Sequence, residues 1–313
     1  MTRTRIPAEV LSLAHDRAAA RGAQAWAEAD RIRSEIERAG WKIVDRGTDF
    51  ALEPAHAPTV EDGAMVRYGS VDAVPSRLPE PASGLATVIL VATDWPADLD
   101  RALTSVLTHA PVGTSVVVVG DGPSAEQEAA LPESREGIEV VRTSARLGTG
   151  AAWTIGIRRS TGPIVIVVDT SVEWTGDVVT PLAAVLADPT VGVAGGFGIV
   201  SDDLRGFADG GPGDVTAIEG YAIAFRRDDA AVRGPIDERF RFYRNLDIWW
   251  SLVLRDEGEG SVPRRALAVP IPAIRHEHRG WTSLSESERD RLSRRNFYRI
   301  IDRFGWRRDL ATG

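Results

Sequence analysis

Apolar runs alternate with amphipathic stretches through the middle of the chain. LATVILVAT, TSVVVVG, IEVVRT and PIVIVVD have the β-branched, bounded character of buried strands. ALTSVLTHA, AEQEAAL and GAAWTIGIRR lie between them with helical spacing. This β-α-β-α order predicts an α/β, Rossmann-like fold, with a mostly parallel sheet, flanking helices and right-handed crossovers.

A helical hairpin is predicted ahead of this region. Residues 7–20 and 24–39 form two helical stretches, and Gly40 stands where a helix would stop. The short extended pieces WKIVD and DFALE follow the glycine. We therefore expect residues 1–54 to form a unit of their own.

The rest of the chain divides by composition. Residues 55–85 are rich in proline, with little periodicity, and predict a linker or surface wrap. Residues 86–280 hold the alternating elements. Residues 281–313 predict a C-terminal amphipathic helix, which a capping box of Ser285 and Glu288 opens.

Composition narrows the class of protein. The 313 residues carry a net charge of −8 and no cysteine, which excludes disulfides and thiolate sites and argues against DNA as a partner. No run of eighteen apolar residues predicts an integral membrane segment, and the first ten residues lack the apolar core of a signal peptide. We expect a cytoplasmic protein, and the sequence leaves a homo-oligomer open.

The stretch IVIVVDTSVEW ends a buried strand with one acid, Asp169. Open α/β sheets bind ligands at the carboxyl ends of their strands, so this acid is the first candidate for a site. A carboxylate there can ligate a hard cation or accept from a ribose hydroxyl. The alternative is that Asp169 only caps a loop.

With its flanks, this stretch resembles the strand that ends in the DxD motif of family 2 glycosyltransferases, although the motif here reads Asp169, Thr170, Ser171. The stretches AIEGYAIAFRRD and GPIDERFRFYRNLDIWWSLVLRDEG resemble the same family, and the likeness extends over about residues 86–305. The resemblance implies a GT-A fold, with a nucleotide-binding half at 86–200 and an acceptor half at 201–280.

The resemblance also implies donor-binding positions. Thr93 follows the first strand, Asp121 follows the second, and Gly148 lies in the turn before the next helix. Asp121 would accept from a base N–H; the alternative is an Asp-Gly turn. Asp169 would hold the metal or the ribose, whereas we expect Trp153 in the core or against the edge of the base.

In the acceptor half, the position of the family's general base is held by Asn245. An amide cannot take a proton, so Asn245 fails that role, and Asp247 becomes the candidate base. The alternatives for Asp247 are that it binds a helix N-terminal amide or braces arginines.

The resemblance implies a bound Mn²⁺ or Mg²⁺ ion, which fewer protein ligands would hold in this chain. Ser171 replaces the second acid of the motif, so weak metal binding is expected. His276 and His278, one residue apart in IRHEHRGW, would face the same way on an extended segment and compensate for the lost acid.

Residues 5–54 resemble the C-terminal tail of cysteinyl-tRNA synthetases in AAARGAQAWAEADRIRSEIERAGWKIVDRGTDF, which includes Asp45, Gly47 and Thr48. The catalytic and zinc-binding parts of the synthetase are absent, so aminoacylation is excluded. The segment is either a small packing or oligomerisation hairpin or a docking element for RNA or protein.

The expected function is transfer of a sugar from a nucleotide diphosphate sugar to a saccharide or other hydroxyl acceptor, and the resemblance implies that the transfer is inverting. The alternative is a catalytically inactive relative that binds a nucleotide or a protein partner. A third hypothesis is an RNA-associated adaptor that uses the N-terminal hairpin.

Overall fold

The computed structural model describes residues 6–46, 49–92 and 94–312. They fall into two compact units, Met1–Thr59 and Val60–Gly313, which we treat separately. Among the described residues, no helix combines the length and the apolar character needed to cross a membrane.

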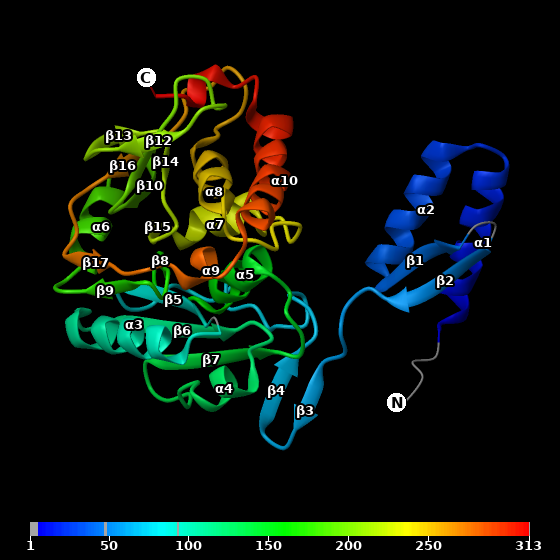
Figure 1. The fold of residues 1–313 in the computed structure, drawn as a ribbon, viewed down its shortest axis with the longest axis horizontal. Helices are drawn as coiled ribbons and strands as arrows, with labels where there is room; N and C mark the ends of the chain where they lie inside the picture. The colour runs from blue at the N-terminus through cyan, green and yellow to red at the C-terminus, as the bar shows by residue number, and fades with distance from the viewer. Residues whose placement is uncertain (1–5, 47–48, 93, 313) are drawn as a thin grey trace. The chain divides into compact units, whose positions relative to one another are not determined.

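The first unit is a helical hairpin followed by a two-stranded antiparallel sheet (Figure 1). Its elements are α1 (Ala8–Gly22), α2 (Trp26–Arg38), β1 (Trp41–Arg46) and β2 (Asp49–Pro54). Gly40, at φ 79°, provides the left-handed turn after α2, which confirms the expected helix stop. Ile36 and Trp41 are buried in a small apolar core, and Arg17 donates two bonds to Asp45, at 2.8 and 3.1 Å. Gly47 and Thr48 lie outside the described residues.

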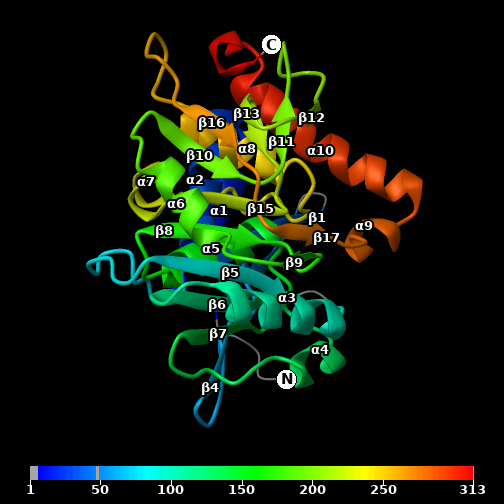
Figure 2. The same ribbon diagram turned by 90° about the vertical axis from the view of Figure 1, so that its left-hand side faces the viewer.

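The second unit is built on a ten-stranded sheet in the order β13-β16-β10-β15-β8-β5-β6-β7-β4-β3 (Figures 1 and 2). The run β8-β5-β6-β7-β4 is parallel, and β15 is antiparallel to both of its neighbours, β8 and β10. The strands of this sheet are β3 (Val60–Asp62), β4 (Met65–Tyr68), β5 (Ala86–Ala92), β6 (Thr114–Gly120), β7 (Ile138–Thr143), β8 (Ile164–Val168), β10 (Val191–Gly195), β13 (Gly213–Val215), β15 (Ala222–Arg226) and β16 (Arg265–Ala268). The predicted α/β fold is confirmed.

Helices cover both faces of this sheet because its strands are apolar on both faces. Along β5, Val88 and Leu90 belong to one core and Ile89 to the other, as the two-residue period of a strand requires. Helix α10 packs on α8 (Figure 1). The helices are α3 (Pro96–His109), α4 (Ala125–Ala129), α5 (Thr149–Arg159), α6 (Val179–Leu186), α7 (Arg227–Arg233), α8 (Leu246–Arg255), α9 (Arg279–Thr282), α10 (Glu286–Phe304) and the 3-10 helix η1 (Arg308–Leu310).

Two small sheets complete the unit. The first has the order β12-β11-β14, and the second pairs β17 with β9. Their bounds are β9 (Val172–Trp174), β11 (Gly198–Val200), β12 (Ala208–Gly210), β14 (Ala217–Ile218) and β17 (Ala273–Arg275).

The proline-rich stretch, expected as a linker or surface wrap over residues 55–85, contributes to the second unit. Its strand β4 pairs with β7, and Val71 and Val74 are buried. Arg227 donates to the carbonyl of Glu80 at 2.9 Å. Composition did not predict these strands, because they are two short segments that depend on pairing with the existing sheet edge.

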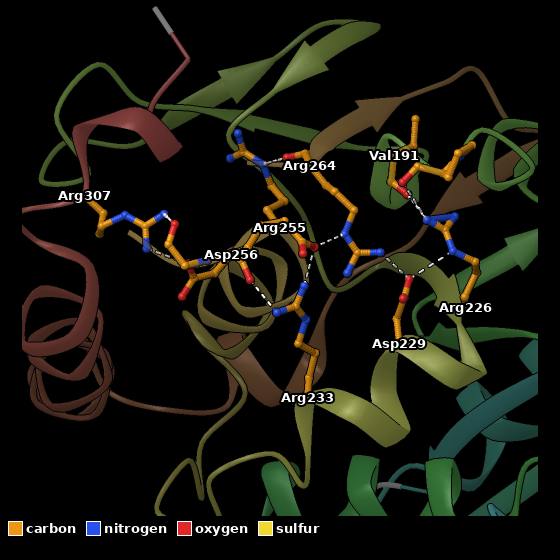
Figure 3. Close-up of polar contacts among 11 residues, drawn as sticks. Val191, Arg226, Asp229, Arg233, Arg255, Asp256, Arg264 and Arg307 are labelled. Atoms are coloured by element: carbon orange, nitrogen blue, oxygen red, sulfur yellow. Dashed lines mark hydrogen bonds and ion pairs between the residues drawn. The ribbon is translucent and has the colours of Figure 1, made fainter. Parts of the chain in front are cut away.

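Arginines form hydrogen bonds and ion pairs between elements of the C-terminal half of the chain (Figure 3). Arg264 pairs with Asp229 of α7 at 2.7 Å, and Arg307 pairs with Asp256, just after α8, at 2.5 Å. Buried Arg255 donates to the carbonyl of Arg264 at 2.8 Å. This network fixes the end of α8 against its neighbours, and thereby the helix that carries Asp247.

Candidate functional site

A pocket of about 310 Å³ lies at the carboxyl ends of β5 and β8. Val91 and Asp169 come from these strand ends, and Asp247 comes from the first turn of α8. Further walls come from the β11-β12-β14 sheet and from residues 278–281. This is the edge where the sequence predicted ligand binding, since strand ends of an open sheet leave a crevice.

Asp169 is held as an ionised carboxylate. Its Oδ1 accepts from the N–H and the hydroxyl of Ser171, at 2.8 and 2.5 Å, and its Oδ2 lies 3.3 Å from Nε2 of His278. Burial alone would raise the pKa of Asp169, but the hydrogen bonds from His278 and Ser171 lower it below its ordinary value.

The ring of His278 is fixed from three sides. Its Nδ1 accepts from the N–H of Trp281 at 3.1 Å, so its proton lies on Nε2, toward Asp169. Tyr243 stacks on the ring with centroids 4.2 Å apart and 23° between the planes, and Tyr221 meets it edge-on at 6.3 Å. Burial opposes protonation, yet the bond to Asp169 raises the pKa of His278.

A divalent ion would find a partial ligand set here. Within the described residues, no three carboxylate, imidazole or thiol side chains gather into a metal-binding group. Asp169 fits as an oxygen ligand, and the hydroxyl of Ser171 and Nε2 of His278 are the donors next to it. An ion bound by His278 would have to displace the Nε2 proton, so tight metal binding needs additional oxygens from substrate and water.

His276 is not brought to this site. Its Nε2 pairs with Glu173 at 2.7 Å, and it is absent from the pocket lining. The two histidines therefore do not face the same way, because the extended segment ends at Arg275 and His278 already caps α9.

Asp247 lines the pocket with both carboxylate oxygens engaged. Its Oδ2 accepts from the N–H of Gly220 at 2.8 Å and its Oδ1 from the N–H of Ile248 at 2.9 Å. Burial raises the pKa of Asp247. A partly buried carboxylate with raised proton affinity is suited to general base chemistry, and the bond to Ile248 shows that it also holds a helix N-terminal amide.

Asn245 has a structural contact that the sequence did not predict. It precedes α8 in the left-handed conformation, at φ 68°, and its Nδ2 donates to the carbonyl of Ser293 in α10 at 3.0 Å. Asparagine tolerates this conformation better than most residues. The amide at this position links two helices.

Asp121 and Gly148, two of the predicted donor-binding residues, are absent from the pocket lining. Buried Asp121 accepts from the N–H groups of Leu147 and Gly148 at 2.7 and 2.8 Å, so it holds the turn before α5. Gly148, at φ 106°, is required by packing, since a Cβ would come 2.6 Å from the Cα of Arg241. Thr93 lies outside the described residues. A base contact by Asp121 stays a prediction.

Sequence reasoning missed several pocket residues. Tyr243 and Tyr221 pack against His278. Glu219 forms a salt bridge with Arg275 at 2.9 Å. Trp281 lies under Arg244, whose guanidinium is 5.2 Å from the ring centroid. The sequence pointed to these pocket residues only through their closeness to Asn245, Gly220 or His278 along the chain.

A mostly parallel sheet with an acid at the end of a central strand and a pocket beside it is the arrangement of a ligand-binding α/β protein. Residues 87–229 match the family model described as Glycosyl transferase family 2, which is the family that the sequence resembles.

A solved structure agrees on the fold. The chain is similar to the crystal structure of GalNAc-T7 with UDP, GalNAc and Mn²⁺, with a TM-score of 0.54 and 16% identity, over 70% of this chain and 48% of that one. A mannosyltransferase from Pyrobaculum calidifontis, in complex with GDP-Man and Mn²⁺, gives a TM-score of 0.45 and 21% identity, over 61% of this chain and 56% of that one.

The N-terminal resemblance is also confirmed. A segment of 50 residues is 50% identical to the cysteine–tRNA ligase of Opitutus terrae, which covers 16% of this chain and 11% of the ligase. The match therefore spans a small part of the ligase's length.

Proposed function

We propose that the second unit transfers a sugar from a nucleotide diphosphate sugar to a saccharide or other hydroxyl acceptor, with inversion at the anomeric carbon. The observation that carries the proposal is that one pocket at the carboxyl edge of the sheet is lined by Asp169, which contacts His278, and by a partly buried carboxylate of raised pKa, Asp247. The family 2 domain supplies the class of reaction.

In this proposal Asp247 is the base. The acceptor hydroxyl gives its proton to the Asp247 carboxylate as its oxygen bonds to the anomeric carbon. The bond from that carbon to the diphosphate breaks at the same time, and its electron pair leaves with the nucleoside diphosphate. A carboxylate that burial makes more basic is suited to this proton transfer.

Asp169 and His278 would serve the leaving group. His278 can donate a hydrogen bond to a diphosphate oxygen from the same nitrogen that now faces Asp169. Asp169 and the hydroxyl of Ser171 would hold Mn²⁺ or Mg²⁺, which when bound would neutralise the charge of the diphosphate. The Mn²⁺ and UDP named for the GalNAc-T7 structure, which shares the fold, agree with this assignment.

The second candidate is a catalytically inactive relative that binds a nucleotide without turnover. It is favoured by Asn245 and Ser171, which stand where the family resemblance implies acids. Asn245 cannot act as a base, so this candidate and the transferase differ on whether Asp247 does.

A donor panel tests both candidates. UDP-, GDP- and dTDP-sugars are mixed with the whole purified chain, with Mn²⁺ or EDTA, and nucleoside diphosphate release and melting temperature are followed. The transferase predicts Mn²⁺-dependent release with at least one donor and its loss in Asp169→Ala at an unchanged melting temperature. The inactive relative would be favoured if a nucleotide raised the melting temperature but no nucleoside diphosphate was released under any condition or with any hydroxyl acceptor.

A further inference from the structure

The segment 242–245 is tied to helix α10 by a reciprocal pair of amides. Asn245 donates from the segment to the carbonyl of Ser293 in α10 at 3.0 Å. Asn296 donates from α10 to the carbonyls of Phe242 and Arg244, each at 2.8 Å. Three hydrogen bonds therefore cross the same joint in both directions.

The orientation of the Asn296 amide is determined by a fourth contact. Arg299 donates from Nη1 to Oδ1 of Asn296 at 3.0 Å, so Nδ2 must be the atom that faces the two carbonyls. Asn296 is 2% exposed, in a helix whose other fully buried side chains are Ile300 and Phe304. A polar side chain in such a position is stable only with its partners in place.

The residue between the clamped carbonyls is Tyr243. Its ring stacks on His278, which in turn contacts Asp169. The clamp also borders Asp247, two residues beyond Asn245. A shift of this segment would thus move a wall of the pocket and the support of the imidazole together.

The segment before α10 is held to the same joint. The guanidinium of Arg244 and that of Arg289, in the first turns of α10, lie over the ring of Trp281, at 5.2 and 4.9 Å from its centroid. These cation–π contacts add to the hydrogen bonds of the clamp.

We propose that Asn245 and Asn296 are positioning residues that clamp segment 242–245 to α10, so that Tyr243 braces His278 against Asp169. The clamp itself does not depend on the proposed transferase activity, whereas its effect on catalysis rests on that activity. Asn245 on this view has a positive role in the site, beyond the loss of an acid.

The spectroscopic test needs no substrate. The chain has five histidines, so the ring protons of His278 can be assigned by ¹H NMR with His278→Gln. Tyr243→Ala gives the shift of the unstacked ring. Asn245→Gly keeps the left-handed backbone and removes only the amide, and Asn296→Ala removes the opposite half of the clamp. Both should move the His278 signals toward the Tyr243→Ala position.

A matched control separates positioning from general destabilisation. Ser105→Ala removes a buried hydrogen bond, from the N–H of Trp174 at 3.0 Å, in the core on the opposite face of the sheet. It should leave the His278 signals at their wild-type position. His278 signals that stay at the wild-type position in Asn245→Gly and in folded Asn296→Ala would overturn the proposal.

The kinetic test distinguishes the clamp from a lost acid. Asn245→Asp is nearly isosteric, tolerates the left-handed conformation and lacks the donor. The clamp predicts a fall in kcat of about 10–100-fold, the order expected for a misplaced catalytic group, together with moved His278 signals. A rise in kcat would overturn the proposal. Absence of turnover in the wild type would count against the transferase, whereas the NMR result would still decide the clamp.

Discussion

Replacement of Asp247 by Asn should separate activity from stability. The carboxylate lines the pocket, and its two oxygens accept from the N–H groups of Gly220 and Ile248. An amide of the same shape keeps one acceptor oxygen and cannot take a proton. We therefore expect transfer to fail in a protein that still folds.

The size of each effect follows from these contacts. Loss of a positioned general base lowers kcat by about 10²–10⁴-fold. Loss of the hydrogen bond to one N–H lowers the free energy of unfolding by about 0.5–1.5 kcal/mol. Removal of a charge from a partly buried position offsets this loss. At about 2–4 °C per kcal/mol for a unit of this size, the melting temperature should stay within about 5 °C of the wild type.

The dependence on pH has a definite sign. Burial raises the pKa of Asp247 in the folded state above its ordinary value of 3.8. Its contribution to stability is thus fully present below that ordinary value and is lost as pH rises through the raised folded pKa. The melting temperature of Asp247→Asn relative to wild type should therefore increase from acid to neutral pH. The acid limb of kcat/KM in the wild type should lie above the ordinary range of an aspartate.

The assay is nucleoside diphosphate release with a working donor and acceptor, beside thermal unfolding across pH. Asp209→Asn is the matched control, because Asp209 lines the same pocket but has no hydrogen bond to α8 within the described residues. It should retain most of the activity. If Asp247→Asn kept wild-type kcat, or lost activity only in step with Asp209→Asn, the assignment of Asp247 as base would be wrong.

Three further outcomes are expected. Asp169→Asn should lower Mn²⁺-dependent release at least about 100-fold, since it removes the charge that faces the ion and His278; donor release at the wild-type rate would contradict this role. EDTA should abolish release and Mn²⁺ restore it, with weak affinity because Ser171 replaces an acid; release that is indifferent to EDTA would exclude the ion from the reaction. Gly148→Ala should destabilise the second unit by about 1–3 kcal/mol, because Gly148 has a φ of 106° and lies close to Arg241. The effect should appear without ligand and at all salt concentrations; an unchanged midpoint of unfolding in urea would contradict this explanation.

The amino-acid sequence by itself determined the layers of the fold. Short, β-branched runs such as IVIVV favour strands covered on both faces, and the amphipathic stretches between them supply the covering helices. It likewise determined that Asp169 stands at a strand end, and that Gly40 and Ser285 mark helix boundaries, since these signals are local.

Tertiary structure decided which candidates share the site. His276 and His278 are close in sequence, yet only His278 reaches Asp169, because the strand ends at Arg275, before both of them, and His278 caps α9. Asp121 is an acid at a strand end like Asp169, but the N–H groups of a turn that follows 26 residues later occupy both of its oxygens. The partner of Asn245 lies 48 residues away in α10. Contacts of this kind depend on how helices pack across the sheet, which no local pattern specifies.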